Sequence, residues 1–159
     1  MQALLQAITT LFQTNATLQG LFPTYDNPPP SNTKVVSTNF WEASNVPENA
    51  PFPFCVATVV SDTQRAIYGS FGTYGPGDTV IRYTVYDNTA AGALNSALTR
   101  AKAMVGVFNS VLPTMPVGEL INIVMQQKPL PAADGYDKNG NPVYRADTVW
   151  LYSTDDLTP

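Results

Sequence analysis

The chain has 159 residues, a net charge of −4 and a charged fraction of only 13%, and it contains no histidine. This length fits one domain spanning residues 1–159, large enough to bury a core without a disulfide or a metal. The eight Lys and Arg residues are scattered, which disfavours nucleic-acid binding because such a site needs a basic patch. No apolar run approaches the roughly 18 residues of a membrane span. We therefore expect a soluble protein, made in a cytoplasm, with a polar but weakly charged surface.

The N-terminal residues predict two helices. Residues 2–13 place apolar side chains at three- and four-residue spacing, as an amphipathic helix does. Residues 15–22 predict a short second helix that ends near Gly20 and cannot continue past Pro23.

Residues 23–53 form a long proline-rich segment. Pro28-Pro29-Pro30 is stiff and lacks the amide donors of a sheet ladder. The aromatic pair Phe40 and Trp41 argues against simple disorder. We expect an extended arm or loop that packs on its own core or on a neighbouring subunit.

The middle of the chain predicts strands around a glycine-rich turn. Residues 54–60 are apolar on both faces and predict a central strand, while 61–68 predict a second, more polar one. Residues 69–78 predict a turn region that presents Phe71 and Tyr74. These aromatic side chains either contact a partner or fold back over the sheet.

A strand that leads into one long helix is the clearest signal in the sequence. Ile81, Tyr83 and Val85 alternate with polar residues, and residues 87–89 supply side chains suited to a helix N-cap. The following apolar stripe predicts one helix that packs back on the sheet; its members are Leu94, Ala97, Leu98, Ala101, Met104, Val105 and Phe108.

The C-terminal third predicts two further strands joined by a turn. The expected strands cover residues 120–125 and 143–152, and a tight turn begins at Asp137. Residues 126–136 carry prolines and a glycine and predict a loop. Residues 154–159 predict a loose acidic tail.

Candidate reactive side chains are few. Cys55 lies in an apolar run and predicts a small buried side chain, because a catalytic thiol usually needs a histidine partner. Asp137, Asn139 and Asn141 imitate the start of a calcium loop, but Pro142 stands where that loop needs glycine. A hairpin turn explains the same residues. We therefore expect no enzyme, no cofactor and no metal site.

The order of these segments resembles the tail terminator (tail completion) proteins of long-tailed bacteriophages. Three stretches carry the likeness: Leu18-Gln-Gly-Leu-Phe-Pro, Ala50-Pro-Phe-Pro-Phe-Cys-Val, and Ile81-Arg-Tyr-Thr-Val-Tyr-Asp-Asn-Thr before the helix, with a closing strand over 144–152. The resemblance implies an α+β fold. This fold would have a mainly antiparallel sheet of about four to five strands, with one long helix and an N-terminal helix packed on it.

The resemblance also implies a role and partners. Such subunits form a ring, expected to be hexameric, that caps the head-proximal end of the tail tube, stops its polymerisation and offers a joining surface to a head-completion or neck protein. DNA would pass through without sequence-specific binding, and the protein would belong to the virion tail or neck. If so, we expect Phe40, Trp41, Phe71 or Tyr74 at a subunit contact. Two alternatives stay open: a connector adaptor or stopper, and an unrelated soluble binding module.

Overall fold

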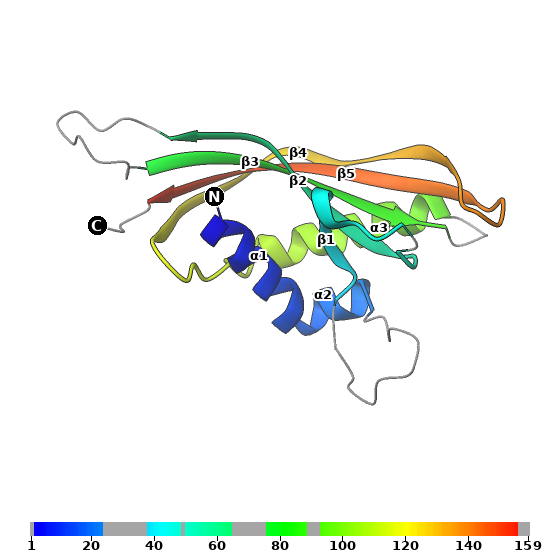
Figure 1. Ribbon diagram of the computed structural model, residues 1–159, viewed down its shortest axis with the longest axis horizontal. Coiled ribbons are helices and arrows are strands. Elements are labelled where there is room, and N and C mark those ends of the chain that lie inside the picture. Colours follow the sequence, from blue (N-terminus) through cyan, green and yellow to red (C-terminus); the bar gives the residue numbers. More distant parts are fainter. Residues whose placement is uncertain (1, 24–37, 49, 65–75, 89–92, 156–159) are drawn as a thin grey trace.

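The computed structural model describes residues 2–23, 38–48, 50–64, 76–88 and 93–155 as a sheet with helices on one of its faces (Figure 1). The elements in chain order are α1 (Gln2–Thr14), α2 (Ala16–Leu21), β1 (Phe40–Glu42), a 3₁₀ turn η1 (Ala43–Asn45), β2 (Phe54–Gln64), β3 (Pro76–Asp87), α3 (Ala93–Phe108), β4 (Glu119–Tyr136) and β5 (Pro142–Asp155). The strand order is β1-β2-β3-β5-β4. Only β1 pairs in parallel; the other neighbours among these five strands are antiparallel. The expected α+β fold is confirmed.

The N-terminal helices form as their sequence predicts. α1 buries Leu4, Ile8 and Phe12 on one side. The Asn15 side chain then accepts hydrogen bonds from the backbone amides of Thr17 and Leu18, at 3.0 and 3.1 Å. These bonds satisfy two of the unpaired donors at the start of α2 and fix the sharp bend between the two helices.

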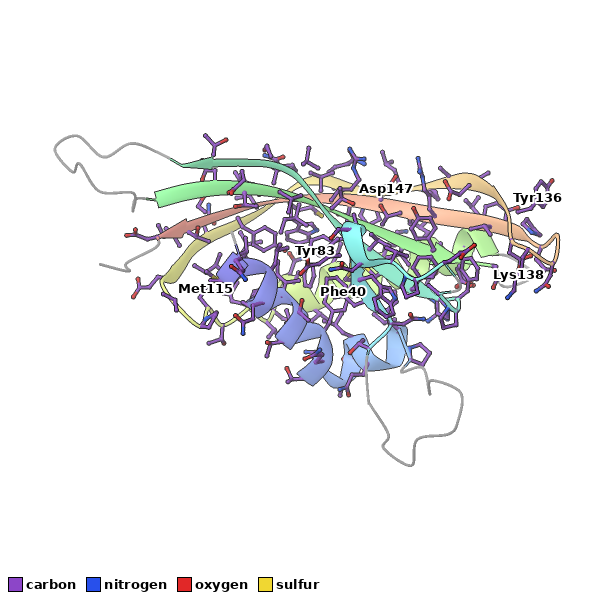
Figure 2. The ribbon with its side chains drawn as sticks, viewed as in Figure 1. Phe40, Tyr83, Met115, Tyr136, Lys138 and Asp147 are labelled. Carbon is purple, nitrogen blue, oxygen red and sulfur yellow. The ribbon has the colours of Figure 1, made fainter. Side chains whose placement is uncertain are left out.

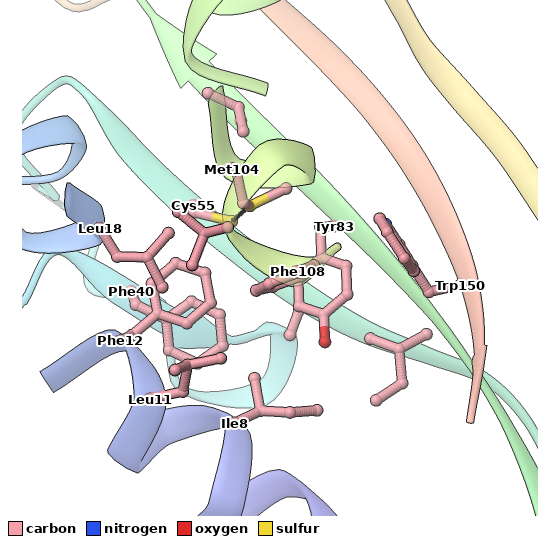
Figure 3. Close-up of a cluster of buried hydrophobic side chains, with 14 of the residues drawn as sticks. Ile8, Leu11, Phe12, Leu18, Phe40, Cys55, Tyr83, Met104, Phe108 and Trp150 are labelled. Carbon is pink, nitrogen blue, oxygen red and sulfur yellow. Dashed lines mark hydrogen bonds between the residues drawn. The ribbon is translucent and has the colours of Figure 1, made fainter. Parts of the chain in front are cut away.

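The core lies between the helices and the sheet and is rich in aromatic rings (Figure 3). Phe12 stacks on Phe40 with ring centroids 3.9 Å apart. Phe108 of α3 meets Tyr83 and Trp150 edge to face, at 5.1 and 5.4 Å. Offset and edge-to-face geometries stabilise aromatic pairs beyond the area that they bury. The core therefore joins α1, β1, β3, α3 and β5 in one cluster.

Cys55 is a buried core residue, as expected. Its Sγ lies 3.9 Å from the Met104 Sδ, and burial raises the pKa of the thiol because a thiolate would lose its hydration. Nearby, the hydroxyls of Tyr83 and Tyr152 share a hydrogen bond of 2.7 Å. Burial also raises the pKa of Tyr83 and of Tyr152, because a phenolate would lose its hydration.

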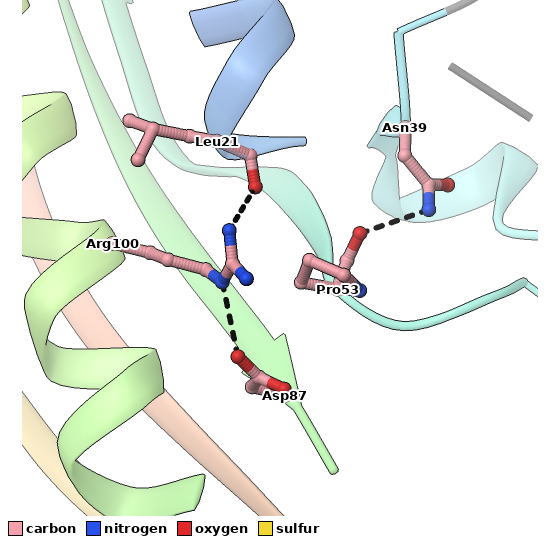
Figure 4. Close-up of polar contacts among 5 residues, drawn as sticks. All are labelled: Leu21, Asn39, Pro53, Asp87 and Arg100. Carbon is pink, nitrogen blue, oxygen red and sulfur yellow. Dashed lines mark hydrogen bonds and ion pairs between the residues drawn. The ribbon is translucent and has the colours of Figure 1, made fainter. Parts of the chain in front are cut away.

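A partly buried arginine connects three elements (Figure 4). Arg100 of α3 donates through Nε to Asp87 Oδ2 at 3.0 Å and through Nη1 to the Leu21 carbonyl at 2.6 Å. Asp87 closes β3, and Leu21 closes α2. The sequence predicts the N-cap of α3 at residues 87–89. Residues 89–92 lie outside the described part of the chain, so this N-cap stays a prediction.

Five segment predictions need correction. Residues 76–78 belong to β3 and not to the turn region expected over 69–78, because Gly77 and Asp78 pair with Gln64 and Thr63 of β2. Residues 126–136 are not a loop: they belong to the edge strand β4, which continues to Tyr136 with several irregularities in its register against β5. Pro129 and Pro131 are tolerated there because one side of an edge strand needs no donors. Ser61–Gln64 continue β2 past a bulge instead of starting a new strand.

The other two corrections concern the last strand and the helix stripe. β5 continues through Thr154 and Asp155, which were expected in a loose tail; Thr154 pairs with Gly77 on β3. In α3, Leu94 is exposed although the sequence predicts it in the apolar stripe, and Val107 is buried although the predicted stripe omits it. None of the described helices is long and apolar enough to cross a membrane.

Candidate assembly surface

The two faces of the sheet differ in what covers them. Ile81, Tyr83 and Val85 point toward the helices and are fully buried. The residues between them point the opposite way, because side chains alternate along a strand. None of the described helices lies on that second side (Figure 1). We call it the open face and consider it a candidate surface for a partner.

An apolar row crosses the open face near the start of β4. Val124 pairs with Leu151 of β5, and Leu151 pairs with Val80 of β3. Val124 is 42% exposed, and Val60 of β2 is also exposed. Apolar side chains in register across three strands make a continuous strip rather than isolated exposed residues.

Polar side chains follow along the same strands. Thr84 Oγ1 donates to Asp147 Oδ1 at 2.7 Å. The Arg145 side chain forms two ion pairs: Nε lies 3.4 Å from Asp147 Oδ2, and Nη1 lies 3.1 Å from Asp134 Oδ1. The second pair joins β5 to β4. Exposed ion pairs of this kind contribute little to stability, so their main effect is to fix where charge lies on the open face.

An open groove lies at the hairpin end of this face. Its volume is about 810 Å³. Its lining comes from loop residues 46–48 and 50–52, from Phe54, Tyr86 and Asn88, and from Asp134, residues 136–139 and Val143 of the β4–β5 hairpin. The Phe54 and Tyr86 rings stack 4.8 Å apart. Tyr136 is 78% exposed and lies near the hairpin tip with Lys138 (Figure 2). We call this feature the hairpin-end groove.

One carboxylate builds the turn beside the groove. Asp137 Oδ1 accepts from the backbone amides of Asn139 and Asn141, each at 2.8 Å, and Oδ2 accepts from the side chains of Asn141 and Asn88, at 3.0 and 2.9 Å. These donors, the Asn141 side chain first, lower the pKa of Asp137 to about 2. The Asn88 bond also ties the turn to the end of β3. The residues that imitate a calcium loop therefore form a hydrogen-bonded turn.

The described residues bring no three potential metal ligands of the His, Cys, Asp or Glu types together. A smaller cavity of about 230 Å³ lies at the opposite end of the sheet, between the last turn of α3 and residues 120–123 of β4. Leu112 and Ile121 are exposed beside it. Both ends of the sheet thus carry exposed apolar side chains.

Of the four side chains that the sequence predicts at a subunit contact, the structure describes Phe40 and Trp41. Phe40 lies in the core against Phe12, whereas Trp41 is half-buried on the edge strand β1 and donates through Nε1 to Asn39 Oδ1 at 3.0 Å. Phe71 and Tyr74 lie outside the described residues. Whether any of the four meets another subunit stays a proposal.

Sequence reasoning missed the residues of the hairpin-end groove. The sequence predicts the run from Ala50 to Pro53 only as part of the proline-rich segment, and residues 134–136 only as part of a loop. The sequence does carry one signal for these groove residues. Along β3, Tyr86 alternates with the apolar core positions and therefore shares the opposite face with Arg82 and Thr84.

No family model matches this chain, and no curated protein matches it. A solved structure does: a chain of the "Virion of native gene transfer agent (GTA) particle" aligns with a TM-score of 0.54 and 17% identity. The alignment covers 97% of this chain and 96% of that one. The two chains therefore share a fold over nearly their whole lengths.

Proposed function

We propose that this protein is a structural subunit of a phage-like virion and has no enzymatic role. The observation that carries the proposal is the end-to-end fold match to a chain of a gene transfer agent virion. A match that covers both chains almost completely compares whole subunits rather than a shared motif. Because fold alone does not fix function, the open face supplies a second, local argument.

The open face suits a protein that works by association. It combines the apolar row through Val124 and Leu151 with the hairpin-end groove and the exposed Tyr136. Contacts at two separate places on one subunit allow head-to-tail joining, which closes into a ring when the rotation between subunits permits.

The finer proposal is a tail terminator. In this role the protein forms a ring, which the resemblance in sequence pattern implies is a hexamer. The ring caps the head-proximal end of the tail tube and prevents further tube subunits from adding. Its other side receives a head-completion or neck protein, and DNA passes through the centre. Because this mechanism is steric, it requires a rigid sheet and complementary interfaces rather than reactive groups.

The test is a tube-assembly experiment with the cognate tube protein. Tubes are polymerised with and without the purified protein, and their lengths and ends are recorded by negative-stain electron microscopy. We expect added protein to stop elongation and to appear as a cap at one end. Uncapped tubes of unchanged length would contradict the terminator role. Binding to portal complexes instead of tubes would identify a connector adaptor or stopper.

A further inference from the structure

The sheet has two outer edges, and each includes a stretch of strand that no described strand covers. β4 is the outer strand on one side and pairs only with β5 among the described strands. On the other side, β1 covers only residues 55–57 of β2, so no described strand pairs with the outer side of residues 58–64. The backbone amides and carbonyls of such an edge form a template for pairing with a strand of another chain.

The first half of β4 lacks the features that usually prevent an edge strand from pairing. Residues 120–127 contain no proline and no charged side chain, and Ile121 is 59% exposed. Edge strands are normally guarded by prolines and by charged side chains, lysine above all. β4 carries its lysine and its prolines beyond this stretch, at Lys128, Pro129 and Pro131. The guarded and unguarded halves of β4 are therefore separate.

The uncovered stretches of the two edges lie at the same level of the sheet. If the pairing is followed across β3 and β5, Thr63 of β2 lies level with Asn122 of β4, and Ser61 lies level with Val124. At the other end, residue 55 of β2, which β1 covers, lies level with Pro131. Both edges are thus available for pairing at one end of the sheet and blocked at the other.

We propose that residues 120–127 of β4 in one subunit pair with residues 58–64 of β2 in the next subunit, so that the sheet continues from copy to copy. The strands β2, β3, β5 and β4 alternate in direction, so β4 runs opposite to β2. A second copy in the same orientation therefore meets the first as an antiparallel pair. The inference rests on the proposed ring and names its head-to-tail junction.

Apolar side chains at the two edges favour this junction. Val124 on β4 is 42% exposed, and Val60, at the bulge of β2 beside Ser61, is 50% exposed. Because Ser61 and Val124 lie at the same level, pairing of the edges brings these two valines close together and removes apolar surface from water. The apolar row of the open face would then continue from one subunit to the next.

The charged side chains of the two stretches are compatible with pairing. Asp62 is the one charged residue within 58–64, and its carboxylate accepts from Thr79 Oγ1 of its own subunit at 2.8 Å. Lys128 follows the β4 stretch and lies level with the end of β1, near Glu42, so opposite charges meet there. Glu119 precedes the stretch and lies beyond the level at which β2 ends.

Disulfide formation between subunits tests the junction in the assembled protein. Cysteine replaces Ser61 or Thr63 on β2 together with Asn122 or Val124 on β4, and these four pairs cover the matched register and offsets of two residues in either direction. Within one subunit, two strands separate these edges by about 14 Å, which is too far for a disulfide. The natural thiol of Cys55 is buried. Thermal melting checks that each variant folds.

The proposal predicts that at least one of the four pairs gives a ladder of covalent oligomers after mild oxidation, seen on a non-reducing gel. The matched control combines Thr63→Cys with Leu130→Cys, which is 58% exposed on the guarded half of β4, and should stay monomeric on the gel. Rings that give no ladder from any pair would overturn the inference and leave the proposed function standing. A covalent dimer of Asn122→Cys alone would also overturn it, because two β4 edges would then pair with each other.

Hydrogen exchange of the unchanged protein tests the same junction without fixing a register. Assembly should slow amide exchange about tenfold or more in residues 58–64 and 120–127, because new hydrogen bonds must open before exchange occurs. Residues 129–136 should exchange as they do in the monomer obtained by dilution. Slowing that leaves both stretches unchanged would overturn the junction. A disulfide ladder formed beside tubes of unchanged length would refute the terminator role alone, and a monomer with and without tubes would overturn both proposals.

Discussion

Trp150 and Leu151 are neighbours on β5 but serve different faces of the sheet. Trp150 is 2% exposed and packs edge to face against Phe108, whereas Leu151 is half-buried in the apolar row of the open face. The helix-covered face completes its packing within the subunit. The open face keeps apolar and aromatic side chains at the surface, although burying them would be favourable. The two faces therefore differ in the apolar surface that they leave exposed to solvent.

The largest effect on stability should come from the covered face. Phe40→Ala removes a ring stacked at 3.9 Å on Phe12 and leaves a cavity, so it should lower the free energy of unfolding by about 3–5 kcal/mol. Denaturant unfolding measures this, with Trp41→Ala, next in sequence but half-buried, as the milder comparison. Equal losses for the two variants would contradict the placement of Phe40 in the core.

Arg100→Met should have the next largest effect. The substitution keeps the aliphatic stem but removes the charge that faces the buried Asp87 carboxylate and the donor to the Leu21 carbonyl. Since Arg100 is partly exposed, we expect a loss of about 1–3 kcal/mol rather than the full cost of a buried, unpaired charge. Lys102→Met on the exposed side of α3 is the control, and an equal change in both variants would refute the role of this contact.

The Asp137 turn should show a pH-dependent effect. The pKa of Asp137 is lowered from 3.8 to about 2 in the fold, so ionised Asp137 stabilises the folded state above about pH 4. This contribution is lost as the pH falls from about 4 toward 2. The stability difference between the unchanged protein and Asp137→Asn should therefore shrink over that range in thermal melts. A difference that is constant from pH 5 to pH 2 would contradict the assignment.

The smallest effect on folding should come from the open face itself. Val124→Thr changes an exposed apolar side chain to a polar one of similar shape, so stability should stay within about 0.5 kcal/mol. Association, followed by sedimentation velocity, should weaken in the same variant. A stability loss as large as that of Phe40→Ala would show that the open face is part of the folding core.

Local patterns in the sequence were sufficient for much of the fold. The amphipathic spacing of α1, the short second helix and the alternation of Ile81, Tyr83 and Val85 all depend on near neighbours in the chain, and each is confirmed. The turn at Asp137 is confirmed for the same reason, since its side chain bonds to amides two and four residues later.

Long-range pairing explains what local patterns missed. Residues 126–136 look like a loop because of Pro129 and Pro131, but at the edge of a sheet only one side of the strand must bond, to β5. Nothing near Phe40 in the sequence reveals that it packs in the core, because this position depends on the long-range pairing of β1 with β2. The groove joins three segments far apart in the chain, so no single motif could predict it.

The central claim is that this protein acts by ring assembly, and its molar mass in solution tests that claim most directly. The mass is measured by light scattering over a wide range of concentrations, with and without tail tubes. The account predicts a species with the mass of a hexamer, alone or on tube ends, that electron microscopy shows as closed rings. A monomer at every concentration that also leaves tube ends bare would contradict it.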